Sequence, residues 1–352
     1  MNEPSPWWNP HVHADRRAFL RQRAAIAAAI RGWFGARDFI EADTAVLQVS
    51  PGNEAHISGF SSELTAADGE KSRFYLHSSP EFACKKLLAA GEERLFTLGH
   101  VFRNGERGPL HHPEFTMLEW YRARESYNQA MTDSEQLVAL AARTAGAAAF
   151  AFRGLSCDPF QPAERLSVAE AFARHADIDI GATLTPLGEG IAGLLLPQAQ
   201  RLGLRVADDD TWSDLFSKIL SACIEPKLGQ GRATLLLDYP ACEAALARRK
   251  ADDPRYCERF ELYACGVELA NGFGELTDAD EQRRRFEAEE AERARIYGAA
   301  YPIDADFLAA LALMPEASGV ALGFDRLVML CAGATHIEQV IWTPVAPRGT
   351  AP

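Results

Sequence analysis

The pattern of apolar and polar positions predicts a helix near the start of the chain, with strands soon after it. The helix is marked by four apolar residues at roughly helical spacing: Phe19, Ile26, Ile30 and Phe34. Asp15 can cap its first turn, so residues 1–14 are expected to form a flexible tail. Strand-like sequence follows over 39–49, and a second helix is predicted over 81–90.

Two further strands joined by a polar loop are predicted over residues 95–122. They are the runs Leu95–Arg103 and Phe115–Tyr121, and the loop between them is rich in Gly, Pro, Arg and His. From about residue 127 to 230 the pattern is mostly helical. This block predicts a helical insertion between two groups of strands.

Strands return after this block, and a strand that continues into a helix lies near the end of the chain. The later segments are strands at 234–238, 260–264 and 267–270, helices at 278–297 and 304–314, and a strand–helix unit at 319–332. Runs of strands separated by a block of helices favour an α+β fold with an antiparallel sheet over a βαβ alternation.

Composition narrows the class of protein without identifying it. The 352 residues include 36 Lys and Arg against 49 Asp and Glu, a net charge of −13 that disfavours tight binding to nucleic acid. Seven scattered cysteines without a CxxC pair predict buried thiols in a reducing compartment. The amino terminus lacks signal-peptide character and the apolar run 24–30 is too short to span a bilayer, so a cytoplasmic protein without a membrane partner is expected.

The first cluster that could carry chemistry is the loop that follows the strand ending at Arg103. Its polar and aromatic residues are Asn104, Glu106, His111 and His112, with Phe115 on the returning strand. Arginine supplies a guanidinium that can bind phosphate, and an aromatic ring supplies a face on which a base can stack. A charged surface hairpin has the same composition, so the pattern alone leaves both interpretations open.

The second cluster surrounds two acidic residues on neighbouring strands, Glu261 and Glu268. If Cys265–Gly266 forms a two-residue turn, Tyr263 opposes Glu268 and Ala270 opposes Glu261. Both carboxylates then lie on one face of the sheet, where they could bind a magnesium ion that also contacts phosphates. A solvated acidic face is the alternative.

The third cluster is the mostly apolar segment Ser318–Leu330, which contains Gly323 and one ion pair, Asp325 and Arg326. A buried arginine is costly unless an anion meets it. Asp325 could be that anion, in a structural salt bridge, or a nucleotide phosphate could be.

Together and in this order, the clusters resemble motifs 2 and 3 of class II aminoacyl-tRNA synthetases of the lysyl branch. The matching segments are 79–81, 102–119, 268–273 and 319–326. The resemblance covers about residues 15–342, and three motifs in register are far more specific than one. It implies a class II synthetase catalytic domain over 15–345, with the helical insertion at 127–230.

The layout is most similar to the truncated members of this family, the elongation factor P lysyltransferases or (R)-β-lysine ligases. A first helix near residue 15 leaves no room for the amino-terminal OB-fold domain with which lysyl-tRNA synthetases bind the anticodon. The resemblance implies activation of (R)-β-lysine or lysine with ATP and transfer to a lysine ε-amino group of elongation factor P. It also implies a homodimer, and tRNA is not expected as the acceptor.

The resemblance further assigns a nucleotide site. Arg103 matches the arginine that binds the α-phosphate, Arg326 the arginine on the γ-phosphate, and Phe115 the ring that stacks on adenine. The other positions implied to contact the nucleotide are Asn104, Gly105, His111, His112, Glu268, Leu269 and Gly323. Glu261 and Glu268 match the ligands of Mg²⁺.

A pocket for a diamino acid is implied beside the nucleotide. Glu81 with Ser79 and Pro80 matches the end that binds the backbone-side amine, while Tyr121, Asn271 and Glu275 match the end that binds the side-chain ammonium. Ala321 falls where lysyl-tRNA synthetases usually carry glycine and the β-lysine ligases carry alanine. A methyl group there favours β-lysine over α-lysine by an amount expected to be about 1–3 kcal/mol.

Three departures from the family pattern leave other functions open. Gly105–Glu106 displaces the acid that contacts the adenine amino group, His112 replaces an asparagine, and Ala45 replaces the motif 1 proline associated with the dimer interface. One alternative is a compact lysyl-tRNA synthetase-like ligase that charges tRNA or another acceptor. The other is a catalytically silent relative that senses an amino acid or nucleotide.

Overall fold

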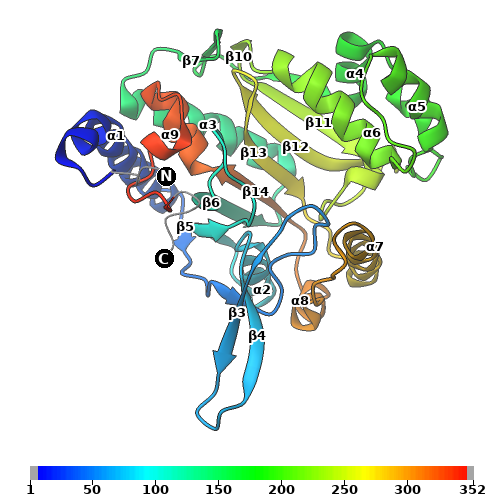
Figure 1. Ribbon diagram of the computed structural model, residues 1–352, viewed down its shortest axis with the longest axis horizontal. Helices are drawn as coiled ribbons and strands as arrows, with labels where there is room; N and C mark the ends of the chain where they lie inside the picture. The colour runs from blue at the N-terminus through cyan, green and yellow to red at the C-terminus, as the bar shows by residue number, and fades with distance from the viewer. Residues whose placement is uncertain (1–6, 347–352) are drawn as a thin grey trace, which may run out of the picture.

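An eight-stranded, mostly antiparallel sheet forms the centre of the molecule in the computed structural model, which describes residues 7–346 (Figure 1). The strand order is β1-β5-β6-β14-β13-β12-β11-β9. Only the two edge pairs, β1 with β5 and β9 with β11, are parallel. The predicted α+β class with an antiparallel sheet is confirmed.

The strands of this sheet are β1 (Ile40–Glu41), β5 (Arg94–Phe102), β6 (Glu114–Ala123), β9 (Glu164–Ser167), β11 (Thr234–Pro240), β12 (Tyr256–Ala264), β13 (Val267–Gly274) and β14 (Ala317–Gly323). Two small sheets contain β2 (Leu47–Gln48), β3 (Phe60–Thr65) and β4 (Lys71–Leu76), and β7 (Phe150–Phe152), β8 (Leu155–Asp158) and β10 (Gly231–Arg232). The α-helices are α1 (Pro10–Gly35), α2 (Glu81–Ala89), α3 (Tyr127–Ala145), α4 (Val168–Ala176), α5 (Ala192–Arg201), α6 (Trp212–Ile219), α7 (Ala279–Tyr297), α8 (Ala305–Leu311) and α9 (Phe324–Ala332).

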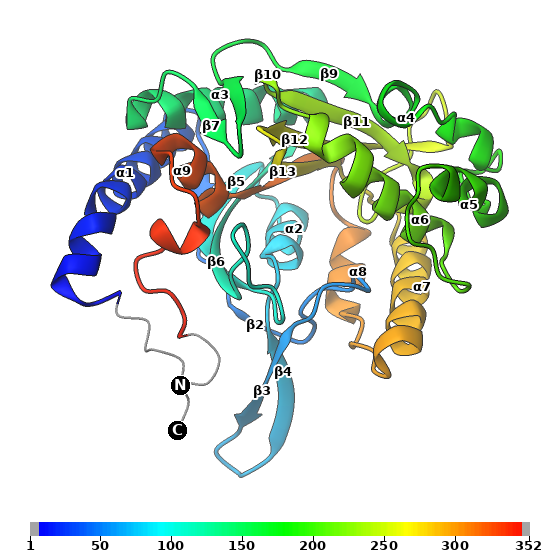
Figure 2. The same cartoon turned by 45° about the horizontal axis from the view of Figure 1, so that its top comes forward.

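Helices α1, α3 and α9 cover one face of the sheet, because its strands alternate apolar and polar side chains. On β6, Leu118 and Trp120 enter a core shared with α1, α3 and α9, whereas Glu119 and Tyr121 point to the other face. Figures 1 and 2 show these three helices grouped on one side of the sheet. Helices α4, α5 and α6 share a second core with the other face of β9, β11 and β12, and α2 and α8 share a third with β5 and β6. The polar part of this face, between the second and third cores, is left for a site.

The amino-terminal prediction is partly wrong. Helix α1 begins at Pro10 rather than near Asp15, because the Asn9 side chain accepts a hydrogen bond from the His11 backbone N–H and proline is favourable in a first helical turn. Residues 10–14 are therefore helical and not a tail. Of the predicted tail, residues 1–6 lie outside the described part of the chain.

Two other predicted segments are also corrected. Residues 39–49 form only the short strands β1 and β2, because the chain leaves the main sheet after two residues and joins a second one. The block 127–230 is not purely helical: it contains β7, β8 and β9, and β9 joins the main sheet beside β11. Its first helix, α3, belongs to the main core because it buries residues such as Leu137 and Ala141.

Burial of the cysteines is largely as predicted, since Cys223 and Cys242 are the only two of the seven that are not buried. Within residues 7–346, no helix combines the length and the apolar character that crossing a membrane requires.

Candidate active site

Paired residues on four neighbouring strands form the floor of a cleft on the open face of the sheet. Glu119 on β6 is paired with Ala321 on β14, which is paired with Asn271 on β13, which is paired with Glu261 on β12. The next row consists of Tyr121, Gly319, Phe273 and Arg259. All eight residues line one cavity of about 280 Å³, in which acidic side chains predominate.

Arg103 enters this cleft from the residue that follows β5. Its guanidinium carbon lies 5.4 Å from the centre of the Phe115 ring, and its Nε is buried without a hydrogen-bond partner. Within residues 7–346, no carboxylate forms an ion pair with it. An unpaired guanidinium beside an aromatic face can bind a phosphate next to a stacked base, as the motif predicts.

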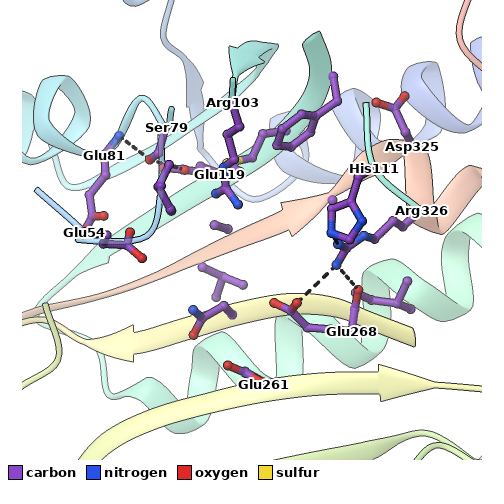
Figure 3. Close-up of a pocket in the computed structure, with 18 of the residues that line it drawn as sticks. Glu54, Ser79, Glu81, Arg103, His111, Glu119, Glu261, Glu268, Asp325 and Arg326 are labelled. Atoms are coloured by element: carbon purple, nitrogen blue, oxygen red, sulfur yellow. Dashed lines mark hydrogen bonds and ion pairs between the residues drawn. The ribbon is translucent and has the colours of Figure 1, made fainter. Parts of the chain in front are cut away.

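Arg326 approaches the same space from helix α9, as Figure 3 shows. Its Nη1 donates to the backbone oxygen of Glu268 at 2.9 Å and lies 3.2 Å from the Glu268 Oε2, while its Nε donates to the Leu110 oxygen. Its Nη2 contacts the His111 Nε2 at 2.8 Å. Desolvation and then the Arg326 charge lower the pKa of His111, which suits a neutral ring that accepts this hydrogen bond.

The turn between β12 and β13 is formed by Cys265 and Gly266, as predicted, with φ values of 53° and 69°. Both angles lie in the left-handed region that a two-residue hairpin turn requires. Tyr263 opposes Glu268, also as predicted.

The predicted pairing of Glu261 with Ala270 is wrong, because Leu269 is an extra residue on β13. This bulge pairs Ala270 with Leu262 and brings Glu261 opposite Asn271. Both carboxylates, Glu261 and Glu268, still line the cleft. The shift therefore changes the partner of Glu261 and leaves the face it occupies unchanged.

Glu225 lies close to this acidic pair and adds to its negative charge. Its carboxyl is 3.4 Å from the Tyr263 hydroxyl, which donates to Glu261 at 2.5 Å. Burial, and then repulsion from Glu261 and Glu268, raise the pKa of Glu225 to about 7. Among residues 7–346 no group of three His, Cys, Asp or Glu side chains is placed to hold a metal ion. The carboxylates of Glu261 and Glu268 nevertheless provide two oxygen donors in an acidic region. This arrangement fits a magnesium ion that takes its other ligands from phosphate and water.

The other end of the cleft is built around Glu119. Its two carboxylate oxygens accept hydrogen bonds from the Ser79 hydroxyl at 2.6 Å and from the Tyr121 hydroxyl at 2.9 Å. Its exposed fraction is 1%, and burial and then repulsion from Glu81 raise its pKa to about 8. A cationic amine placed here would favour the ionised carboxylate.

A buried lysine joins two of the predicted pocket acids. The Lys85 Nζ lies 2.6 Å from a carboxylate oxygen of Glu81 and 2.6 Å from one of Glu275. Burial opposes the charged form of Lys85, but the two carboxylates outweigh it and raise its pKa. Gly319 permits this packing, because a Cβ there would lie 2.3 Å from the Glu275 Oε1 and 2.4 Å from the Tyr121 ring.

Most predicted site residues meet in this cleft, but three do not line it: Pro80, Asn104 and Gly105. Pro80 precedes α2, and Asn104 donates its backbone N–H to the Ser58 oxygen. Gly105 has a φ angle of 85°, so the chain turns at this residue, and the next residue, Glu106, lines the cleft. The acid that appeared displaced in the sequence therefore still lines the cleft.

His112 lies at the edge of the cleft and is held by backbone groups. Its ring nitrogens contact the Glu114 oxygen at 2.5 Å and the Val345 N–H at 3.2 Å, and its exposed fraction is 1%. These contacts give the side chain a structural role.

Sequence reasoning gave no role to four residues that shape the site: Glu54, Lys85, Glu119 and Arg259. Lys85 follows Glu81 at helical i, i+4 spacing, and Glu119 alternates with buried apolar residues of a predicted strand, so both carried a detectable signal. Glu54 lies in a loop, and Arg259 reaches the cleft through a strand pairing that the predicted register does not include. Neither had a comparable signal.

Three arginines, of which Arg103 has no ion-pair partner among residues 7–346, and a row of carboxylates on an antiparallel sheet form the arrangement of a class II synthetase-type catalytic site. The sequence matches the family described as "tRNA synthetases class II (D, K and N)" over residues 9–346. The chain belongs to this class II tRNA-synthetase family.

The curated relatives are more specific in name. A protein of Histophilus somni (strain 2336) is 38% identical over 336 residues, which cover 95% of this chain and 96% of the relative. One from Yersinia enterocolitica is 39% identical over 351 residues, 98% of this chain and 99% of its own. One from Salmonella paratyphi B is 40% identical, covering 95% and 96%. Each is named elongation factor P--(R)-beta-lysine ligase.

Proposed function

We propose that this protein activates (R)-β-lysine, or lysine, with ATP and transfers it to a lysine ε-amino group of elongation factor P. The observation that carries the proposal is one cleft with a phosphate-binding end at Arg103 and Arg326 and an acidic end at Glu81 and Glu119. The names of relatives at 38–40% identity over most of both chains support the same substrate and acceptor.

Activation joins the substrate carboxylate to the α-phosphate of ATP and releases pyrophosphate. This step needs positioning and neutralisation of charge more than a protein nucleophile. Arg103 supplies a cation without a competing carboxylate among the described residues, and Phe115 a ring face for the base. Arg326, already fixed by Glu268 and His111, presents the second guanidinium.

Glu261 and Glu268 would hold Mg²⁺ at this end of the cleft. The bound ion supplies positive charge that offsets the negative charge of the phosphate oxygens. Arg259 and Tyr263 contact the two oxygens of Glu261 at 2.8 and 2.5 Å and so orient that carboxylate. Burial, and then repulsion from Glu261 and Glu268, raise the pKa of Glu225, and a bound cation would offset this repulsion.

The acidic end suits a substrate with two amines. Glu81, Glu119 and Glu275 carry more potential negative charge than Lys85 alone neutralises. A site built around such charged hydrogen bonds can reject analogues that lack an amine by roughly 10⁴ to 10⁵.

The deciding experiment is intact-mass analysis of elongation factor P after incubation with this protein, ATP and either (R)-β-lysine or lysine. A mass increase of one lysine residue, dependent on ATP, is expected, with the larger yield from the β-isomer. Parallel reactions with tRNA test the alternative acceptor. Modified tRNA with unmodified elongation factor P would contradict the proposal, as would ATP binding without either product.

We also propose that the protein is a homodimer. The apolar side chains of Ile40, Leu47 and Val49 in and beside β1 and β2 are 57%, 44% and 42% exposed, and a second copy could cover them. Ala45 lies among them. Sedimentation equilibrium should give twice the mass of 38.6 kDa.

A further inference from the structure

A second cavity opens beside the cleft described above. Its volume is about 790 Å³, and its walls are α6, residues 241–249 and α7, which lie near one another at the right of Figure 2. Ligand pockets have volumes of roughly 300–1,000 Å³. Glu54, Ile57 and Arg259 line both cavities, so the two cavities adjoin at these residues.

The charged side chains of this second cavity are close to balance, because six carboxylates face five lysines and arginines, of which Arg249, Arg284 and Arg285 share the one carboxylate of Glu281. Each of its lysines and arginines has a carboxylate partner in an ion pair: Lys218, Arg249, Arg259, Arg284 and Arg285. Within residues 7–346, four of its carboxylates have no such cationic partner: Glu54, Asp214, Glu243 and Glu289. These four carboxylates are the groups of the cavity that can receive a cation.

An unpartnered amide independently points to a ligand. Gln282 on α7 has an exposed fraction of 0% and lines the second cavity. Neither its Nε2 nor its Oε1 has a hydrogen-bond partner among the described residues. Buried amides are almost always paired, and a donor and an acceptor in one group match a peptide backbone.

The loop that carries Glu54 is held in place at the junction of the two cavities. The Glu289 carboxylate accepts from the Ala55 N–H at 2.9 Å, and the Arg293 Nη1 donates to the Ala55 oxygen at 2.8 Å. The Asn53 amide donates to Glu290 at 2.7 Å. Figure 3 shows Glu54 beside Glu81, at the end of the cleft away from Arg326. Glu54 thus borders both the amino-acid end and the second cavity.

We propose that the second cavity binds the lysine-bearing segment of the acceptor protein and that Glu54 receives its ε-ammonium. This inference rests on the proposed function and adds the acceptor site, which that function leaves unassigned. The four carboxylates guide the cationic side chain toward the cleft, and Gln282 pairs with backbone groups of the acceptor. Glu54 then lies beside the acceptor nitrogen, at the border with the adenylate site.

The transfer step follows from this placement. Glu54 takes one proton from the ammonium, and the free amine attacks the carbonyl carbon of the adenylate. A C–N bond forms while the C–O bond to the phosphate breaks, and AMP leaves with that electron pair. The second proton passes from the nitrogen to solvent water as the amide forms. The Glu54 side chain is exposed where the two cavities adjoin, so an incoming ammonium can reach its carboxylate.

The test separates activation from transfer in the full-length protein. Pyrophosphate exchange with ATP and (R)-β-lysine measures activation, and single-turnover mass analysis measures transfer from the preformed adenylate to elongation factor P. The variants are Glu54→Gln, Glu289→Gln and Gln282→Leu, and the matched control is Glu287→Gln, an exposed residue of α7 outside both cavities. Hydroxylamine, which is uncharged at neutral pH, serves as a second acceptor.

Transfer to elongation factor P should fall about ten- to hundredfold more than exchange in Glu54→Gln, and by a smaller ratio in the other two variants. Transfer to hydroxylamine should follow exchange, and the control should match the unchanged protein in every assay. Equal losses of exchange and transfer, or equal losses with both acceptors, would overturn the acceptor site while leaving the proposed function intact. Failure of the unchanged protein to modify elongation factor P would instead overturn the proposed function.

Discussion

Ala321 lies directly between Glu119 and Asn271 in the row of paired residues that forms the floor of the cleft. Its methyl group therefore separates the acidic end of the site from the carboxamide on β13. A glycine at this position would open space between the two polar groups. A larger side chain would fill the space that the amino acid needs.

Replacing Ala321 with glycine should reduce the preference for (R)-β-lysine over lysine. The ratio of the kcat/KM values for the two isomers should change by an amount that corresponds to a free-energy difference of about 1–3 kcal/mol. This is the scale of one methyl or methylene group in a pocket. Pyrophosphate exchange with each isomer measures it. Ala270→Gly, on the core side of β13, is the control, because it carries the same cost of glycine in a strand without altering the cleft. A proportional change with both isomers would show that Ala321 does not select between them.

Arg103→Ala should lower adenylate formation by at least a hundredfold, because it removes the one cleft arginine that has no ion-pair partner among residues 7–346. The fold should be retained, since no described carboxylate loses a partner. Pyrophosphate exchange and thermal unfolding together check both statements. If exchange persists at the rate of the unchanged protein, Arg103 does not act on the phosphates.

Glu119 should make the protein less stable as pH rises. Burial, and then repulsion from Glu81, raise its folded-state pKa to about 8, against about 4.3 for an unfolded chain. The folded state thus keeps a proton that the unfolded state has lost. The resulting stabilisation is complete below the unfolded pKa and disappears as pH rises through about 8.

Glu119→Gln, which stays neutral, should show a smaller loss of unfolding free energy between pH 6 and pH 9 than the unchanged protein. Urea unfolding at several pH values gives the difference. Burial also raises the pKa of Glu275 to about 7, so only the difference between the two profiles isolates Glu119. Parallel profiles would contradict the assignment. Glu93→Gln, at an exposed ion pair, is the matched control.

Local patterns were sufficient to predict the hairpin that carries Arg103 and the turn at Cys265–Gly266. Alternating apolar residues set the strands, and a two-residue turn sets Tyr263 opposite Glu268. The bulge at Leu269 could not be predicted, because it depends on how β13 packs between β12 and β14. The sequence around Leu269 therefore contains no pattern from which this bulge could be predicted.

The amino-acid end of the site was predicted only in part for the same reason. The acids Glu81 and Glu275 were expected from the family resemblance, yet their shared cation, Lys85, depends on α2 lying next to Glu275, the residue that follows β13. The helical block 127–230 likewise concealed β9, whose four residues are too short for a periodic pattern. Contacts between elements that are distant in the sequence could be identified only from the structure.

Lys85→Met should be among the most destabilising single substitutions in this site. The ammonium has an exposed side-chain fraction of 1% and neutralises Glu81 and Glu275, so its loss leaves buried carboxylates without a cation. Removing one partner of a buried pair costs about 3–5 kcal/mol. Lys71→Met, at an exposed pair with Glu63, should cost no more than about 1 kcal/mol.

The double variant Lys85→Met with Glu275→Gln separates the loss of charge balance from the loss of packing. Because the amide removes one uncompensated anion, the double variant should be more stable than Lys85→Met alone. Urea unfolding at a fixed pH measures the free energy of unfolding of the unchanged protein, Lys85→Met, Lys71→Met and the double variant. If Lys85→Met unfolds like Lys71→Met, or if the second substitution destabilises further, Lys85 is not the cation that holds these two acids in the folded protein.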